Sequence, residues 1–303
     1  MWCDISIRQQ YTVRMKYIIA LLAAATAFPS ALCPLVVSNC STRYPIILVH
    51  GVSARDDDAA VAYWGRIPGR LRTEGALVFF SGQDAWRSHA GNAMIIKRSI
   101  SSAMQAAGTA KVNLIAMSKG GIESRYAITH LGMAPYVASL TTIATPHCGS
   151  SVADFALEQY RTFGTAAALT FSLAGALSGD KDPDVREAAV ELSIPYMKEF
   201  NRTCPDSPLV YYQSHAFVMK RPECNLLLAF QHAIILAREG ANDGLVSTAS
   251  AQWGTFRGII EGELNGTGVS HFHAHDGFRN NVSGFDTPAF YVSVVRELKV
   301  HGF

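Results

Sequence analysis

The sequence predicts an α/β protein in which a mostly parallel sheet is flanked by helices on both faces. Short apolar runs of strand length alternate with helical patterns along most of the chain, which is typical of parallel sheets. The 303 residues are 49% hydrophobic and 17% charged, enough apolar material for one large core or two small ones. The formal net charge is +2 without a basic stripe, so we expect no nucleic-acid partner.

The strands and helices are predicted in order from residue 46. Apolar runs predict buried strands over residues 46–49, 76–80, 112–117, 140–144 and 209–212. Helical patterns lie at residues 64–71, 92–107 and 120–131, and the chain ends on an amphipathic helix containing Phe290, Val294 and Leu298. Gly108 closes the second helix, because glycine tolerates the left-handed conformation found at helix ends.

Residues 150–205 interrupt this alternation. They contain an apolar stretch at 166–177 and a charged helical pattern at 182–200. No low-complexity linker or internal repeat separates them from the rest of the chain. We therefore expect a single domain, residues 32–303, with an inserted segment at about 150–205.

Residues 1–31 are predicted to be an N-terminal extension and signal peptide. Arg14 and Lys16 precede a short apolar run with small residues after it, the pattern of a secretory signal. The run is short for a membrane-spanning helix, and an uncleaved membrane anchor is the alternative interpretation. We expect a secreted, extracellular protein.

The expected location outside the cell also bears on the state of the cysteines. In an oxidising compartment, those beyond the signal peptide are candidates for disulfides. The local pairings are Cys33 with Cys40 and Cys204 with Cys224, which leaves Cys148 unpaired. Spacing alone leaves the connectivity open.

The most informative motif surrounds Ser118. The predicted strand at 112–117 runs into this serine, and a helix that starts with glycines follows it. Such a turn is sharp and exposes the serine hydroxyl, and small residues two positions before and after let strand and helix approach closely. Ala116 and Gly120 occupy those positions. Ser118 is therefore the candidate nucleophile, and the alternative is an ordinary turn with an incidental serine.

A serine nucleophile needs a histidine that takes its proton and an acid that orients the histidine. In enzymes with a strand–serine–helix turn of this kind, the acid comes after the serine in the sequence, and the histidine comes after the acid. Asp243 stands in a short polar turn before an apolar Leu-Val pair, which suits a carboxylate at the end of a strand. His271 follows small loop residues most directly and is the preferred base, with His273 as the reserve.

The histidines at 271, 273 and 275 alternate along the chain, a pattern that could also indicate a metal site. We interpret them as a polar loop in which one histidine is functional. His130, His147 and His232 are interpreted as structural.

Two backbone N–H groups are candidates for an oxyanion hole. One follows the first strand and the other belongs to the residue after the nucleophile. Gly51 lets the backbone come close to a substrate, so we expect the N–H groups of Val52 and Lys119 to be the donors.

With these motifs the chain resembles the secreted bacterial-type triacylglycerol lipases of the α/β-hydrolase superfamily, above all those with a Ser-Lys-Gly-Gly nucleophile elbow. The resemblance runs in order and in register from about residue 44 to the end of the chain. The segments that carry it are Tyr44–Gly51, Tyr63–Pro68, Lys111–Ile115, Ser118–Gly121, Ser124–Tyr126, Thr141–His147, Asn242–Val246, Phe285–Val292 and Val295–Lys299.

The resemblance implies a serine hydrolase that cleaves carboxylic esters of lipids, as a triacylglycerol lipase or carboxylesterase, with Ser118, Asp243 and His271 as the triad. It implies Val52 and Lys119 as oxyanion donors and an acyl-enzyme without a catalytic cofactor. It also implies a lid within residues 150–205, an ester or lipid substrate, and contact with a lipid–water interface. Oligomeric state, acyl chain length and the alcohol part of the substrate stay open.

Two departures from the resemblance concern the site. Those lipases hold a structural calcium and have an aspartate two residues after the catalytic histidine, where this chain has His273. A structural calcium is therefore an open expectation that His273 argues against. Lys119 replaces a neutral or apolar residue after the nucleophile, and its cation either favours anionic substrates or points to solvent.

Other functions fit the same motifs. A thioesterase or a polyester depolymerase would use the same triad, and its specificity would lie in the pocket and lid. A catalytically silent binding protein that kept the fold would need no triad. A metalloenzyme would use the histidine cluster instead of Ser118.

Overall fold

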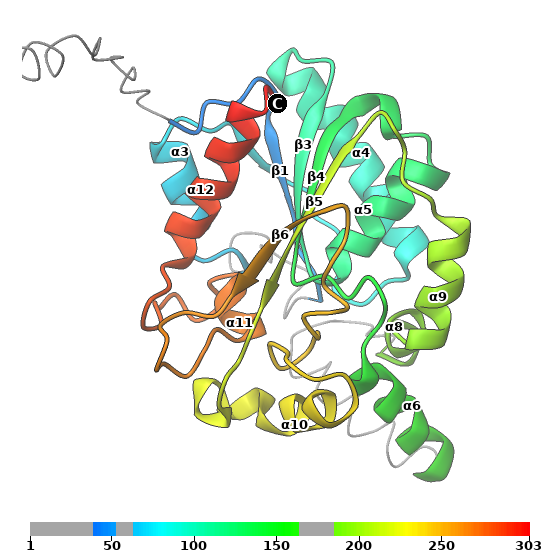
Figure 1. Ribbon diagram of the computed structural model, residues 1–303. Coiled ribbons are helices and arrows are strands. Elements are labelled where there is room, and N and C mark those ends of the chain that lie inside the picture. The colour runs from blue at the N-terminus through cyan, green and yellow to red at the C-terminus, as the bar shows by residue number, and fades with distance from the viewer. Residues whose placement is uncertain (1–38, 53–62, 164–184) are drawn as a thin grey trace, which may run out of the picture. The chain divides into compact units, whose positions relative to one another are not determined.

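The computed structural model describes residues 39–52, 63–163 and 185–303 (Figure 1). The predicted signal peptide and the apolar stretch at 166–177 lie outside these residues. Among the described residues, no helix is both long and apolar enough to cross a bilayer.

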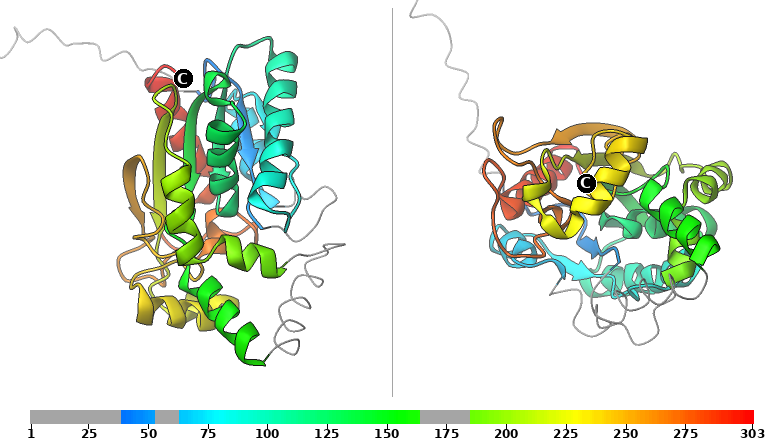
Figure 2. Two further views of the ribbon diagram at one scale, coloured as in Figure 1. Left: turned by 90° about the vertical axis from the view of Figure 1, so that its right-hand side faces the viewer. Right: turned by 90° about the horizontal axis from the view of Figure 1, so that it is seen from below.

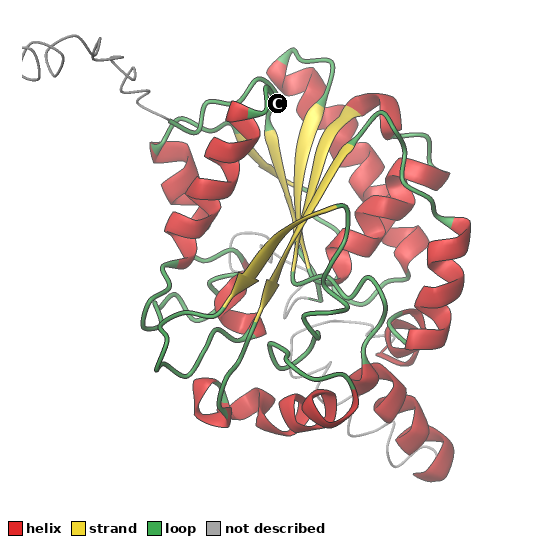
Figure 3. Cartoon of the chain, viewed as in Figure 1, coloured by secondary structure: helices red, strands yellow, loops and turns green. Residues whose placement is uncertain are grey.

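The described residues form a six-stranded sheet with the strand order β2-β1-β3-β4-β5-β6. Every strand pair is parallel. The strands are β1 (Ile46–Val49), β2 (Val78–Phe80), β3 (Val112–Met117), β4 (Val137–Ile143), β5 (Tyr211–Phe217) and β6 (Thr255–Ile260). The prediction of a mostly parallel sheet between helices is therefore confirmed (Figure 3).

One face of the sheet is covered by α3 (Ile67–Thr73) and α12 (Thr287–Val300). Both helices contribute apolar side chains to a core cluster with alternate residues of β1 and β3. Trp64, Tyr291 and Leu298 are fully buried there. The amphipathic pattern predicted at the C-terminus is thus the stripe that packs on the sheet.

The opposite face is covered by α4 (His89–Ala107) and α5 (Lys119–His130), which also pack on each other (Figure 1). Ser88 caps α4 by accepting a hydrogen bond from the Gly91 N–H, and Gly108 ends it with a φ of 63°. A smaller apolar cluster joins α5 to α9 (Ile194–Thr203) through Ile122, Met197 and Phe200.

Several helices gather where the strands end at their carboxyl termini (Figures 1 and 2). These are α6 (Ser151–Phe163), α8 (Val185–Glu191), α10 (Ala229–Arg238) and α11 (His271–Ala274). Short 3-10 helices complete the fold at Ala134–Tyr136, Pro222–Cys224 and Leu226–Leu228. In parallel sheets, ligand sites form at this end of the strands.

The charged pattern at 182–200, predicted as one helix, is two helices in the structure. α8 ends at Glu191, and α9 starts at Ile194. The Ser193 hydroxyl accepts a hydrogen bond from the Tyr196 N–H, and a proline stands in the first turn of α9. Proline lacks the N–H that a continuous helix would need, so the chain starts a new helix here.

The expected disulfide between Cys204 and Cys224 is wrong, because both cysteines are free thiols. Cys204 is buried at the end of α9, beside the Arg125 guanidinium, which donates to the Cys204 carbonyl oxygen. The Cys224 sulfur lies 3.3 Å from the Gly268 carbonyl oxygen. Cys33 lies outside the described residues, so its pairing with Cys40 stays a prediction.

Candidate active site

Ser118 stands on a strained turn between β3 and α5. Its φ of 54° and ψ of −131° are rare for a residue with a side chain, and its N–H donates to the Ile143 carbonyl oxygen at 2.9 Å. A Cβ at Gly51 would lie 2.7 Å from the Ser118 Cβ, and a Cβ at Gly120 would lie 2.3 Å from the His50 carbonyl oxygen. Glycines at both positions therefore let the end of β1 pack directly against the elbow.

Asp243 and His271 form a buried hydrogen-bonded pair. The His271 Nδ1 lies 2.7 Å from the Asp243 Oδ2, and the two side chains are 4% and 1% exposed. The other carboxylate oxygen, Oδ1, accepts the N–H groups of Leu245 and Val246 at 2.9 and 2.8 Å. These bonds fix the carboxylate and the ring, and Nε2 is the ring nitrogen left for proton transfer.

Ser118 and His271 line the same cavity, which has a volume of about 350 Å³. This volume lies in the range of small-molecule sites. The other lining side chains are mostly apolar, and they come from α6, α8, α11 and the loops after β1, β2, β4 and α10. They include Val52, Trp86, Ala153, Leu157, Leu192, Leu245 and Phe272.

The segments that carry the two predicted oxyanion donors both adjoin Ser118. Val52 lines the cavity just after β1, and Lys119 is the first residue of α5. The N–H groups of a helix's first turn have no partner within the helix and carry its positive dipole end. The His50 ring holds the first segment, with its nitrogens 2.7 Å from the Gly51 carbonyl oxygen and 2.9 Å from that of Gln83.

His273, the reserve base, is not the histidine that pairs with the acid. Its Nδ1 lies 2.8 Å from the Ser270 hydroxyl in a capping box at the start of α11, and burial lowers its pKa. Within the described ranges, no three His, Cys, Asp or Glu side chains are placed to hold a metal ion. The structural calcium, against which His273 argues, stays an open expectation.

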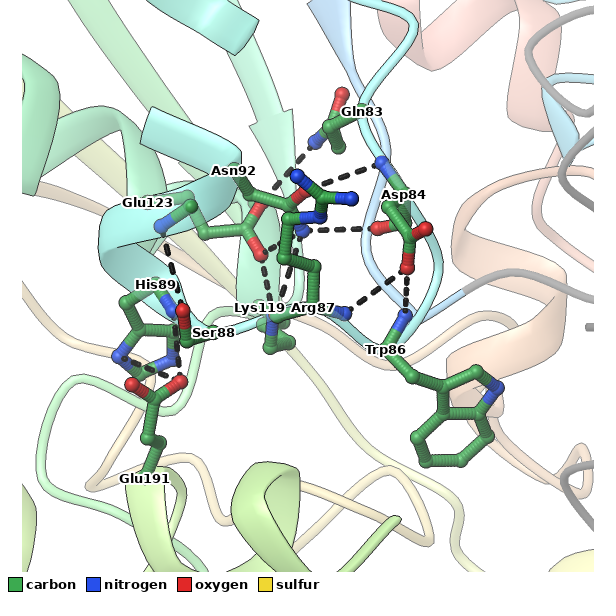
Figure 4. Close-up of polar contacts among 12 residues, drawn as sticks. Gln83, Asp84, Trp86, Arg87, Ser88, His89, Asn92, Lys119, Glu123 and Glu191 are labelled. Atoms are coloured by element: carbon green, nitrogen blue, oxygen red, sulfur yellow. Dashed lines mark hydrogen bonds and ion pairs between the residues drawn. The ribbon is translucent and has the colours of Figure 1, made fainter. Parts of the chain in front are cut away.

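Lys119 does not reach solvent or the cavity through its side chain. It is fully buried, and its ammonium group contacts the Glu123 carboxylate and the Arg87 carbonyl oxygen (Figure 4). The paired carboxylate compensates the cation. The expectation of a solvated charge is therefore wrong, and the preference for anionic substrates stays an untested hypothesis.

Tyr63 and His275 are site residues that sequence reasoning did not assign. Both line the cavity, and their rings stack with centroids 4.0 Å apart. The His275 Nδ1 lies 2.9 Å from the Tyr63 carbonyl oxygen, and burial lowers the pKa of His275 to about 4. His275 is thus a neutral ring in the cavity wall. Only the tertiary fold brings these positions together.

Comparison with solved structures identifies the architecture. The Staphylococcus hyicus lipase superposes with a TM-score of 0.61 at 15% identity, covering 86% of this chain and 98% of that one. The mature Bacillus licheniformis lipase gives 0.60 at 22%, covering 83% and 91%. A metagenomic carboxyl esterase gives 0.65 at 20%, covering 85% and 76%. The fold is that of the α/β-hydrolases.

Sequence comparison adds relatives that carry a functional name. A triacylglycerol lipase of Burkholderia plantarii is 34% identical over 204 residues, which cover 62% of this chain and 56% of the relative. One of Pseudarthrobacter phenanthrenivorans is 35% identical over 182 residues, which cover 56% of each. The chain therefore spans about half the length of the curated relatives it matches. No family model matches the chain. These relatives confirm the predicted resemblance to triacylglycerol lipases over about half of their length, and they do not test the Ser-Lys-Gly-Gly elbow.

Proposed function

We propose that the protein is a secreted serine hydrolase that cleaves carboxylic ester bonds of lipids through an acyl-enzyme on Ser118. The observation that carries the proposal is the shared cavity of Ser118 and His271, with Asp243 hydrogen-bonded behind the histidine. Its relatives named triacylglycerol lipase favour the same chemistry.

In the proposed first step, His271 Nε2 takes the proton of Ser118 while the serine oxygen attacks the ester carbonyl. The Asp243 carboxylate holds the proton on Nδ1 and stabilises the imidazolium. The proton then passes to the leaving alcohol, and an acyl-enzyme forms. Water enters next, with His271 as base, and hydrolysis returns Ser118 to its free form.

The backbone N–H groups of Val52 and Lys119 are the proposed donors to the oxyanion. Donors of this kind act on the charge that develops in the transition state, and removing one costs about 10²- to 10³-fold in kcat. The apolar wall of the cavity suits an acyl chain better than a charged substrate. The lid proposed within residues 150–205 would include α6 and α8, whose side chains line this wall.

The proposal is tested by hydrolysis of p-nitrophenyl esters of graded chain length, beside the same assay on Ser118→Ala. We expect the wild type to hydrolyse them and the variant to lose about 10⁴-fold or more in kcat. A preference for long chains supports a lipase, and a preference for short chains supports a carboxylesterase. Equal activity of wild type and variant would exclude Ser118 as the nucleophile.

A further inference from the structure

Glu123 is a buried carboxylate that does not reach the cavity. It lies in the first turns of α5, four residues after Lys119, and both side chains are at most 2% exposed. Its oxygens accept hydrogen bonds from three side chains: the Lys119 ammonium, the Asn92 amide at 2.7 Å and the Gln83 amide at 3.2 Å. A buried ion pair is tolerated only when such additional bonds satisfy both partners.

Gln83 links this carboxylate to the first oxyanion segment. Its amide nitrogen also donates to the His50 carbonyl oxygen at 2.6 Å. The Gln83 backbone carbonyl, in turn, lies 2.9 Å from the His50 ring. His50 stands two residues before Val52, so Gln83 holds the backbone that leads to one proposed donor.

Lys119 connects the same carboxylate to the second donor and to the cavity wall. Its own N–H is the other proposed donor, and its ammonium reaches the carbonyl oxygen of Arg87. Arg87 is next to Trp86, which lines the cavity. The Asp84 carboxylate accepts the N–H groups of Trp86 and Arg87 at 2.9 and 3.0 Å, which keeps this loop folded.

We propose that Gln83, Glu123 and the Lys119 side chain are positioning residues, which fix the separation of the two oxyanion donors. The inference rests on the proposed function of the site. Figure 4 shows these residues and the loop at 84–88 between them. Glu123 connects the segment after β1 with the start of α5. Gln83 donates both to Glu123 and to the His50 carbonyl oxygen at the end of β1, and the Lys119 ammonium at the start of α5 donates to the same carboxylate.

The geometry explains why a lysine stands directly after the nucleophile. A helix N-terminus repels a cation, so a lysine in the first turn is unfavourable by itself. Here the i, i+4 carboxylate compensates the charge, and three anchored donors leave the carboxylate little freedom to move. The pair therefore acts as a rigid spacer rather than as a substrate-binding charge.

The sharpest variant is Gln83→Leu, because it removes the side-chain hydrogen bonds to the His50 carbonyl oxygen and to Glu123 without leaving a charge unpaired. The matched control is Ser139→Ala, which removes another buried hydrogen bond, to Asn113 at 2.8 Å, on β4. A second variant, Lys119→Met with Glu123→Leu, replaces the whole pair by apolar groups, an exchange that buried ion pairs often tolerate without loss of stability.

The assay compares kcat and KM for a p-nitrophenyl ester with the affinity for an alkyl boronic acid. The boron accepts the Ser118 oxygen and becomes a tetrahedral anion while His271 takes the serine proton, so its affinity reports on the oxyanion donors. We expect both network variants to lose about 10- to 100-fold in kcat, less than removal of a donor costs. The boronate Kd should rise by the same factor, and KM should stay within about threefold.

Three outcomes separate the explanations. Wild-type kcat in Gln83→Leu, with an active wild type and an inactive Ser118→Ala, would overturn the positioning role and leave the proposed function intact. Equal losses in Ser139→Ala would reduce the effect to general stability and also overturn it. A wild type that hydrolyses no ester and binds no boronate would overturn both proposals together.

Discussion

Asp243→Asn should abolish activity without unfolding the protein, because the structure dictates how the new amide must lie. Oδ1 of Asp243 accepts two backbone N–H groups, those of Leu245 and Val246. An asparagine keeps these bonds only with its amide oxygen at that place, which puts its NH₂ group toward His271 Nδ1. Two donors would then face each other unless the ring carries its proton on Nε2. In that tautomer Nε2 cannot take the proton of Ser118.

The magnitude follows from the equivalent change in serine proteases, where the wrong tautomer lowers kcat by about 10⁴-fold. At about 1.4 kcal/mol for each factor of ten, the loss is about 5 to 6 kcal/mol of transition-state stabilisation. The assay is steady-state hydrolysis of a p-nitrophenyl ester, with the urea-unfolding midpoint measured in parallel. A kcat within about tenfold of wild type in a folded Asp243→Asn would refute the tautomer argument and the assignment of the acid.

Three further predictions test other parts of the account. Gly120→Ala should lower the free energy of unfolding by about 1–3 kcal/mol and strongly reduce activity, because its Cβ would meet the His50 carbonyl oxygen at 2.3 Å; unchanged urea unfolding would contradict the close packing. Burial raises the pKa of Glu191 from 4.5 to about 7, so the fold prefers the neutral acid and loses stability as pH rises through this range. Glu191→Gln should therefore flatten the fall in urea-unfolding midpoint between about pH 4.5 and 7, and a variant that keeps the wild-type slope would argue against this. Cys204 and Cys224 should both react with a thiol reagent after unfolding without reductant, because the structure has them as free thiols. If neither reacts, they form a disulfide and the structure is contradicted.

Much of the sheet could be predicted because its central strands are continuous apolar runs. Ile46–Val49 and Val112–Met117 are buried on both faces, and their predicted and observed bounds agree. β6 escaped prediction because it is an edge strand with alternating exposure and Gly258 inside it. The helix α10 escaped for a related reason: its exposed Phe230 and Leu236 blur the contrast between its two faces.

The candidate site could be predicted in part from local sequence patterns. Ser118, Asp243 and His271 each stand in a local pattern of strand end, turn and small residues, so sequence could nominate them one by one. Their contacts cross long stretches of chain, and only the fold shows that Asp243 meets His271 rather than His273.

The buried network around Glu123 was harder to predict from the sequence. Its i, i+4 spacing with Lys119 is visible in the sequence, but such pairs usually lie on solvated helix faces. The partners that make it a buried spacer, Gln83 and Asn92, come from the segment after β2 and from α4. The sequence of α5 alone gives no indication of these two partners.

The most direct test of the central claim is the site of reaction with a p-nitrophenyl alkylphosphonate. The reagent should form one bond between phosphorus and the Ser118 oxygen, release one p-nitrophenolate and stop, because the product mimics the tetrahedral intermediate. Intact-mass and peptide analysis should find one adduct for each chain, on the peptide containing Ser118, and none on Ser118→Ala. An adduct on another residue, or equal labelling of the variant, would contradict the account.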